Sequence, residues 1–400
     1  MARPARWLLA VIIPVLLLPT LYTVLRQAGP LWDEGSYHLP AIERFGPGLP
    51  SLEVLRDYNS AVGPLFYVVL ANVGALAGNR LPVLRLAVFL LAAINVLLFW
   101  LLGRRLVPGG RFSPLLLLVS YPYFFSLSGL LMSEHLALCF GLLALLGYLR
   151  WTEDDAPWAL AGSLVAASAA VLTRQFYAFL PVGLAIAEFL RSRGRGRMRA
   201  ILPLLSLLPL AGLVLLWRGM VPPSFQGVYA PGFTPGTASS VLAWTGLFFL
   251  PFLFARLARQ RFRLSPWLLL ALPAVPCALV FPPDGIGLTR TIVHRLPGSL
   301  PAIAGAVLAL LGAAHLVMLG QRLAGADAAR RAPAIIGLAV LLVLLASGTP
   351  VFERYFLPAF VFLLLFELPD TRGWWPLAWS LGIQLPLAVV QLLRLAPVTG

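Results

Sequence analysis

Apolar runs about as long as a bilayer is thick follow one another along this whole chain of 400 residues. About 20 apolar residues in helical form cross the hydrocarbon core of a membrane, and a water-soluble protein cannot cover so many such segments. Hydrophobic residues make up 60% of the sequence and charged residues only 11%, and the mean hydropathy is +0.89. The sequence therefore predicts an all-α polytopic membrane protein.

The connections between the runs indicate how the chain threads the membrane. The densest arginine clusters, Arg191 to Arg199 and Arg256 to Arg263, lie in short connections, and positive charge is retained on the cytoplasmic side. Alternation from these points predicts thirteen transmembrane helices, with the N-terminus cytoplasmic and the C-terminus outside. The predicted helices are Trp7–Leu25, Leu81–Leu102, Pro114–Gly129, Leu136–Tyr148, Trp158–Leu172, Phe176–Leu190, Ile201–Trp217, Val241–Ala255, Pro266–Phe281, Leu300–Leu319, Ala334–Ser347, Tyr355–Phe366 and Trp375–Leu393.

The first run follows Arg3 and Arg6, as the apolar part of a signal peptide would. It is long, however, and no small-residue cleavage site follows it, so we expect a retained helix. No internal repeat and no separate soluble domain is visible, which predicts a single membrane domain over residues 1–400.

The charged and sulfur-bearing residues exclude other classes of function. All 30 basic residues are arginines and the formal net charge is +15, but they cluster where loops orient a membrane protein, so nucleic acid is not an expected partner. Cys139 and Cys277 lie in apolar runs, which argues against a disulfide, and no residues have the spacing of metal ligands. We expect no cofactor, with the metal requirement left open.

One long outer region, Leu31 to Arg80, interrupts the membrane runs. Its segment Gly63 to Gly78 could span, but it contains Pro64, and counting it as a span would place later arginines outside. We therefore expect two helices that lie against or dip into the interface, the second amphipathic or re-entrant.

The acidic pair Asp33-Glu34 opens this outer region, directly after Trp32. Such a pair at a membrane edge could simply mark the end of a helix. Its companions His38 and Pro40, the length of the loop and a second acid, Glu134, favour a site in which a carboxylate deprotonates a hydroxyl beside a lipid substrate.

Further polar residues on the outer side each have a structural and a functional interpretation. Glu134 precedes an apolar helix, where it could cap the helix or belong to the site. Arg174 and Gln175 interrupt a continuous apolar stretch; the arginine could snorkel to the interface, but a guanidinium facing outward is well suited to phosphate.

Two later outer segments are weaker candidates. The Glu353-Arg354-Tyr355 segment could be a local ion pair or could face a lipid phosphate, and the loop from Asp284 to His294-Arg295 could cradle a phosphate or be an ordinary polar loop. Three features have structural readings instead: a packing histidine at His315, a cytoplasmic anchor at Ser192 to Arg199, and a solvated acidic loop at Glu153-Asp154-Asp155.

The order of these motifs resembles the GT-C superfamily of integral-membrane glycosyltransferases. It is most similar to the terminal (alpha-1,2) glucosyltransferase family of the dolichol pathway, whose motifs appear here in order. They are Asp33-Glu34 with His38-Leu39-Pro40, Gly63-Pro64-Leu65-Phe66-Tyr67, Pro122 with Glu134, and Thr173-Arg174-Gln175. Three departures, an extra residue before His38, exchanged Gly and Pro before Leu65, and Glu for Asp at Glu134, bear on the sugar and the acceptor more than on the class.

The resemblance implies an inverting transfer of a sugar, glucose or another hexose, from a polyprenyl-phosphate donor to a lipid-linked or extracytoplasmic glycan. The compact loops and the use of arginine as the only basic residue favour a bacterial inner membrane, with the active site outside, and we expect a monomer. The resemblance also implies catalytic roles for Asp33 and Glu34, and substrate binding by a second set of residues. The set is His38, Tyr67, Glu134, Arg174, Gln175, His294, Arg295, Glu353, Arg354 and Tyr355.

The main rival function is a transporter or lipid-linked sugar flippase, because Arg174 and the Pro- and Gly-broken segments could line a path. Transporters usually have internal repeats and charges at the membrane midplane, whereas the ionisable groups here gather at one interface. A structural subunit of a membrane complex would leave the ordered acidic motifs unexplained.

Overall fold

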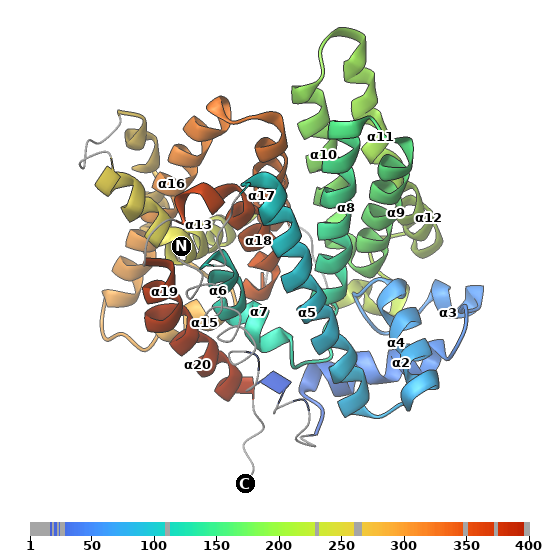
Figure 1. Cartoon of the computed structure of the whole chain (residues 1–400). Helices are drawn as coiled ribbons and strands as arrows, with labels where there is room; N and C mark the ends of the chain where they lie inside the picture. Colours follow the sequence, from blue (N-terminus) through green and yellow to red (C-terminus); the bar gives the residue numbers. More distant parts are fainter. Residues whose placement is uncertain are drawn as a thin grey trace, which may run out of the picture. The chain divides into compact units, whose positions relative to one another are not determined.

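The computed structural model describes residues 17, 20, 21, 24, 29–108, 113–228, 232–259, 266–346, 351–371 and 375–395. Helices and turns build this part of the chain, with one isolated parallel bridge between Ile286 and Phe352 (Figure 1). The prediction of an all-α membrane protein is confirmed. The predicted helix Trp7–Leu25 lies outside the described residues except at isolated positions.

The chain divides into two compact units. Unit 1 comprises residues 1–228 and 380–400, and unit 2 comprises residues 229–379. The helices of unit 1 are η1 Glu34–His38, α2 Leu39–Phe45, α3 Leu52–Arg56, α4 Pro64–Ala77, α5 Leu81–Leu106, α6 Ser113–Ser120, α7 Pro122–Leu127, α8 Glu134–Asp154, α9 Pro157–Thr173, η2 Gln175–Ala178, α10 Phe179–Arg191, η3 Gly194–Ala200, α11 Ile201–Leu204, η4 Leu205–Leu207, α12 Leu208–Trp217, η5 Pro223–Val228, η9 Ser380–Gln384 and α20 Leu385–Leu395.

Unit 2 has fewer and longer helices. They are α13 Pro235–Arg259, η6 Pro266–Ala271, α14 Ala274–Val280, α15 Leu288–Val293, α16 Leu300–Gly325, α17 Ala328–Leu345, η7 Glu353–Phe356, α18 Leu357–Glu367, η8 Leu368–Asp370 and α19 Trp375–Trp379. The single domain over residues 1–400 stays a prediction.

Seven helical segments among the described residues are long and apolar enough to cross a membrane. Two further predicted spans correspond to the shorter apolar helices Pro157–Thr173 and Pro266–Val280, and a third such helix, Pro64–Ala77, lies in the segment that was predicted not to span. The total of thirteen stays a prediction. The seven segments are Leu81–Leu106, Glu134–Asp154, Gly196–Trp217, Pro235–Arg259, Leu300–Gly325, Ala328–Leu345 and Trp375–Leu392.

Proline breaks one helix that the sequence predicts as continuous. The predicted span Pro114–Gly129 divides into α6 and α7 at Tyr121, whose backbone is extended, with a φ of −60° and a ψ of 124°. Pro122 follows it, and a proline disfavours helical geometry in the residue before it.

The outer region, Leu31 to Arg80, contains three helices, α2, α3 and α4, where two were predicted.

Helices α8 and α9 form the closely packed centre of unit 1, with α5 against the other side of α8 (Figure 1). The two helices approach at Gly147, where an added Cβ would lie 2.9 Å from the carbonyl oxygen of Ala159. The hydroxyl of Ser163 also donates to the Ala144 carbonyl at 2.8 Å. Small residues thus let the two backbones come together, as is common between membrane helices.

The acidic run that ends α8 is both exposed and paired. Arg105 Nε of α5 donates to Glu153 Oε1 at 2.7 Å, Arg150 pairs with Asp154 at 2.5 Å, and Arg199 of η3 pairs with Asp155 at 3.1 Å. The predicted solvated loop therefore also joins three elements at one end of unit 1. Each such exposed pair contributes little alone, about 0–1 kcal/mol.

The outer region of unit 1 is held by aromatic and polar contacts. Trp217 Nε1 at the end of α12 donates to the Leu55 carbonyl at 2.8 Å, and the Tyr58 hydroxyl donates to the Val62 carbonyl at 2.8 Å. Partial burial raises the pKa of Asp57, but hydrogen bonds from the Ser224 hydroxyl and backbone N–H outweigh it, so the net shift is downward. These contacts tie the segment around α3 to the chain that follows α12.

In unit 2, α13 and α16 pack through a pair of glycines. An added Cβ on Gly246 would lie 2.0 Å from the Leu308 carbonyl oxygen, and one on Gly312 would lie 1.9 Å from that of Leu242. No side chain fits at either position. The two helices therefore meet backbone to backbone, and van der Waals contact along that line stabilises the pair.

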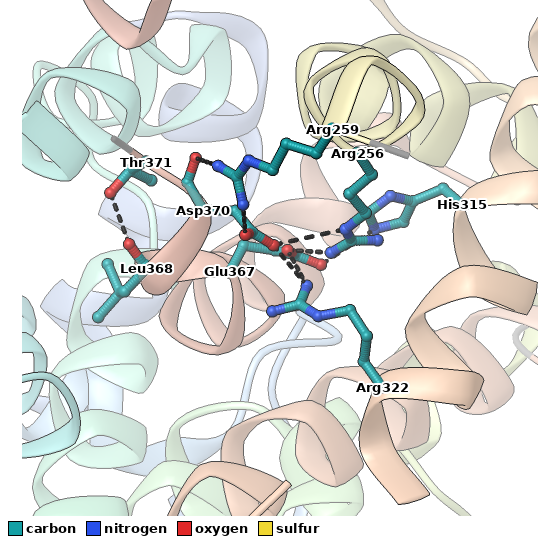
Figure 2. Close-up of polar contacts among 8 residues, drawn as sticks. All are labelled: Arg256, Arg259, His315, Arg322, Glu367, Leu368, Asp370 and Thr371. Atoms are coloured by element: carbon teal, nitrogen blue, oxygen red, sulfur yellow. Dashed lines mark hydrogen bonds and ion pairs between the residues drawn. The ribbon is translucent and has the colours of Figure 1, made fainter. Parts of the chain in front are cut away.

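A buried cluster of charged residues joins α13, α16 and the end of α18 (Figure 2). Figure 2 shows three arginines and a histidine facing two carboxylates. The residues are Arg256, Arg259, His315, Arg322, Glu367 and Asp370.

Glu367 lies at the centre of this cluster and is fully buried. It pairs with Arg256 and, at 2.7 Å, with Arg322, which also lies 2.8 Å from Asp370. His315 stacks on a phenylalanine ring with its Nε2 3.7 Å from Glu367 Oε1, so the predicted packing histidine also faces a carboxylate. Buried charges need such mutual compensation, and the cluster locks three helix ends together.

Candidate active site

Glu34 is the most fully engaged carboxylate of the predicted site. Its Oε1 accepts from Arg85 Nε at 3.0 Å and from the Leu131 N–H at 2.7 Å. Its Oε2 accepts from Arg85 Nη2 at 2.5 Å and from the Leu31 N–H at 2.8 Å. Four donors saturate a carboxylate that is 0% exposed, so Glu34 has little capacity left for a substrate.

These four bonds explain the local fold. Glu34 is the third residue of a helix that begins at Trp32, and its side chain reaches back to the backbone N–H that precedes the helix, as in a capping box. The bidentate bond from Arg85 then attaches this turn to α5, and the Leu131 bond attaches it to the segment before α8.

Asp33 precedes Glu34 in this rigid turn and is partly exposed. The charges of Asp33 and Arg174 both act on the hydroxyl of Tyr67, which places these three groups within electrostatic reach of one another. A π-helical turn, η1, follows directly, and such turns are frequent at functional sites. Of the acidic pair, Asp33 is therefore the more exposed residue.

His38 and Tyr67 form a buried chain of hydrogen bonds. The Tyr67 hydroxyl donates to Ser60 Oγ at 2.6 Å, and His38 Nδ1 lies 3.1 Å from the same hydroxyl oxygen. Because the Tyr67 proton is given to Ser60, the His38 Nδ1–H is the donor to Tyr67. Both ring residues are buried, so this chain fixes α2 against α4 beside Asp33.

Gly63 joins the motif before α4 to the end of α9. Its N–H donates to the Thr173 carbonyl at 3.0 Å, and an added Cβ would lie 2.1 Å from the Leu172 carbonyl oxygen. Only glycine allows this approach, which brings the residues around Tyr67 next to Arg174. Two motifs that are far apart in the sequence thus lie next to each other in the fold.

Arg174 and Glu134 meet as an ion pair. Arg174 Nη1 lies 2.5 Å from Glu134 Oε1 and 3.3 Å from Ser133 Oγ, and both side chains are largely buried. Glu134 occupies the first turn of α8, where its charge also complements the helix dipole. The two readings of Glu134, helix stabilisation and a place in the site, are therefore compatible.

Gln175 follows Arg174 and is 8% exposed. Its amide Nε2 has no hydrogen-bond partner among the described residues. A buried donor in this state beside a charged pair suits a hydrogen bond to a ligand.

Arg85 is a site residue that the sequence argument missed. It lies within the predicted span Leu81–Leu102 and is 3% exposed, yet it was not singled out. The signal was present, because an arginine inside an apolar run is expensive unless it faces a partner.

The later candidates lie in unit 2. Glu353, which is fully buried, accepts from the Thr289 N–H at 2.9 Å and from the Thr289 hydroxyl at 2.6 Å. The Arg354 guanidinium lies over the rings of Phe352 and Tyr355. Glu353 thus fixes the start of α15, and the Glu353-Arg354-Tyr355 segment is held by contacts within unit 2.

A cavity of about 220 Å³ lies next to α15 in unit 2. His294 and Arg290, one helical turn apart, line it together with Thr289, Ser299 and the edge of Trp244. Arg295, a weaker candidate from the sequence, is not among the residues that line it. The polar side chains of this cavity can all donate hydrogen bonds, and the hydroxyls can also accept them, which suits an anionic or hydroxyl-rich ligand.

Within the described part of the chain, no group of three His, Cys, Asp or Glu residues could hold a metal ion.

A crystal structure of ArnT from Cupriavidus metallidurans in the apo state is 16% identical, with 90% of this chain and 76% of that chain covered and a TM-score of 0.43. ArnT bound to undecaprenyl phosphate is 15% identical, with 90% and 77% covered and a TM-score of 0.45. No curated protein matches the chain. Residues 61–217, which hold Tyr67, Glu134 and Arg174, match the model of a glycosyltransferase family described as dolichyl-phosphate-mannose-protein mannosyltransferase.

Proposed function

We propose that the protein is an inverting membrane glycosyltransferase that moves a sugar from a polyprenyl-phosphate donor to a lipid-linked or extracytoplasmic glycan. The observation that carries this proposal is the contrast within the acidic pair. Glu34 is fully buried and accepts four hydrogen bonds, whereas the neighbouring Asp33 is partly exposed, which makes Asp33 the carboxylate that we propose as the base. The family match over residues 61–217 supports the same class of reaction.

The proposed reaction is a single displacement. Asp33 accepts the proton of the acceptor hydroxyl, whose oxygen attacks the anomeric carbon of the donor sugar. The bond from that carbon to the phosphate oxygen breaks, its electron pair leaves with the polyprenyl phosphate, and the anomeric centre inverts. Phosphate is a good leaving group, so the mechanism needs a base but no strong acid.

The neighbouring groups take supporting roles in this proposal. Arg174, oriented by Glu134, stabilises the developing phosphate charge, and Gln175 donates its amide hydrogen to the sugar or the phosphate. Glu34 and Arg85 hold Asp33 in place, so Glu34 is a positioning residue in this scheme. His38 and Tyr67 shape the wall on the α4 side.

The finer assignments are also proposals. The transferred sugar is a hexose, with glucose the first candidate, and the protein resides in a bacterial inner membrane with its active site outside. His294, Arg295, Glu353, Arg354 and Tyr355 form a second group for substrate binding, in which the cavity beside α15 adds Arg290.

The test is transfer in nanodiscs from a panel of radiolabelled polyprenyl-phosphate sugars to lipid extract, with and without a chelator. Asp33→Asn is expected to lower kcat by about 10²–10⁴-fold, the usual contribution of a general base. Glu53→Gln, at an exposed carboxylate of α3 in the same region, is the matched control and should retain activity. Near-wild-type turnover by Asp33→Asn would show that the base is another group, and transfer from no donor together with sugar flux in liposomes would favour a transporter.

A further inference from the structure

The connection between α10 and α11 in unit 1 is the most basic segment of the chain. Residues 191–199 contain five arginines and no acidic residue. The arginines are Arg191, Arg193, Arg195, Arg197 and Arg199. How much of this charge is left for a partner depends on which arginines already pair with carboxylates of the fold.

Two of the five arginines are held in this way. Glu188 of α10 accepts from Arg191 Nε at 2.9 Å and from Arg191 Nη2 at 3.0 Å, and its Oε1 also accepts from the Ser192 hydroxyl at 2.6 Å. Arg199 Nη1 lies 3.1 Å from Asp155 Oδ1. Glu188 is fully buried in these bonds, so it has no capacity left for a further arginine.

Arg193 and Arg197 are exposed, and neither forms an ion pair with a carboxylate in the described part of the chain. Arg193 precedes Gly194, whose φ of +55° lies in the left-handed region that glycine adopts without strain. The chain turns there, and η3 packs back against the end of α10. The Arg197 guanidinium lies over the Phe189 ring, 4.9 Å from its centre, and a guanidinium stacked in this way keeps N–H donors at its edge.

Exposed apolar side chains flank these two arginines. Phe189 and Leu190 lie in the last turn of α10, Met198 lies in η3, and Ile201 begins α11; all four are exposed. The next segment that is long and apolar enough to cross a membrane, Gly196–Trp217, begins inside η3. Guanidinium groups beside apolar side chains at this level match the boundary between lipid headgroups and acyl chains, whereas a water-soluble anion would need no apolar neighbours.

We propose that the η3 connection, defined as residues 190–201, is a binding site for anionic phospholipids. The lipid phosphate pairs with Arg193 and Arg197 through charge-assisted hydrogen bonds, and Leu190, Met198 and Ile201 contact the adjoining acyl chains. Each basic residue next to an anionic membrane surface raises the affinity about fivefold. This inference goes beyond the proposed glycosyl transfer and does not depend on it.

The test compares two lipids that differ in headgroup charge. Binding of dioleoylphosphatidylglycerol to the purified protein in detergent is titrated by native mass spectrometry, with dioleoylphosphatidylcholine as the reference without net charge. The test variant combines Arg193→Gln with Arg197→Gln. The matched control combines Arg44→Gln with Arg56→Gln, which removes the same charge from two exposed arginines in the outer region of unit 1. Equal melting temperatures in phosphatidylcholine establish that both variants are folded.

The test variant is expected to bind phosphatidylglycerol about tenfold or more weakly than the wild type, with its affinity for phosphatidylcholine unchanged. The control variant should keep the wild-type affinity for both lipids. The preference of the wild type for phosphatidylglycerol should fall between about 0.1 M and about 1 M salt, because salt screens exposed charges. An unchanged affinity of the test variant, or an equal loss in both variants, would overturn the site.

Two further measurements identify the ligand and its place. Inorganic phosphate should displace phosphatidylglycerol no better than chloride at the same ionic strength, and specific displacement by phosphate would show a site for a free anion instead. Phosphatidylglycerol with a diazirine in its headgroup should label residues 190–201 in nanodiscs, and the test variant should suppress this labelling. Labelling confined to other segments would contradict the proposal. None of these measurements requires glycosyl transfer, so a failure of the proposed function would leave them valid.

Discussion

At the scale of single residues, the two members of the acidic pair have different physical situations. Glu34 is buried and bound by Arg85 and two backbone N–H groups, whereas Asp33 is partly exposed beside it. Of these two sequence neighbours, Glu34 therefore stabilises the turn, and Asp33 is the more exposed carboxylate.

This division predicts opposite effects of two conservative substitutions. Glu34→Gln leaves the buried Arg85 without a counter-charge and turns an amide NH₂ toward its donors, which should destabilise the fold by about 3–5 kcal/mol. Asp33→Asn should leave stability almost unchanged. Apparent melting temperatures in the same detergent measure the difference, and equal melting temperatures of the two variants would contradict the structural role of Glu34.

A second prediction concerns Gly63. Gly63→Ala would bring a Cβ to 2.1 Å from a backbone oxygen of Leu172, which cannot rotate away, so α4 must separate from the end of α9. We expect a loss of transfer activity of about 10²-fold, because displacement of a site by 1 Å has effects of that size. Gly212→Ala, at an exposed glycine of α12 whose added Cβ meets nothing within 4 Å, is the control and should keep full activity.

The sequence predicted the members of this site better than their roles. Asp33, Glu34, His38, Glu134 and Arg174 were selected as charged or polar residues at the edges of apolar runs, and Tyr67 was selected through the motif resemblance. Their contacts within unit 1 bring these residues close together. Arg85 was not identified because it was counted as part of a helix. Pairing between residues that are far apart in the chain cannot be predicted from their spacing.

At the scale of elements, apolar length predicted helices well and proline predicted their interruptions. The division of the predicted span Pro114–Gly129 at Tyr121 follows from Pro122, a signal that was available. The charged cluster of unit 2 could not be predicted from the sequence in this way. Arg256, Arg322 and Glu367 each end a different helix, and only the packing of α13, α16 and α18 brings them together.

This cluster predicts that unit 2 depends on one carboxylate. Glu367→Gln removes the charge that two arginines share in a buried place, and should destabilise the protein by about 3–5 kcal/mol. The comparison is Asp327→Ala, which removes the exposed side-chain cap of α17 and should cost about 1 kcal/mol. If thermal unfolding showed the cap to be the more costly loss, the cluster would not hold the helix ends.

At the scale of the whole molecule, the charged groups of unit 1 gather at two ends of its membrane helices. One end holds the start of α5, the start of α8 and the end of α9, joined through Glu34–Arg85 and Glu134–Arg174. The opposite ends of α5 and α8 carry the pairs of Arg105 with Glu153 and Arg150 with Asp154. The arrangement agrees with a site at one membrane surface and arginine-rich turns at the other.

The direction of this arrangement is a prediction of the positive-inside rule, which retains arginine-rich loops in the cytoplasm. A cysteine introduced at Glu53, which is exposed between α2 and α4, should react with a membrane-impermeant maleimide in intact spheroplasts. A cysteine at Arg199, exposed in η3, should react only after the membrane is permeabilised. The native Cys139 is buried and Cys277 is partly buried, so the unsubstituted protein gives the background. The reverse pattern of labelling would put Asp33 on the cytoplasmic side, where the acceptor would have to be a cytoplasmic molecule rather than an extracytoplasmic glycan.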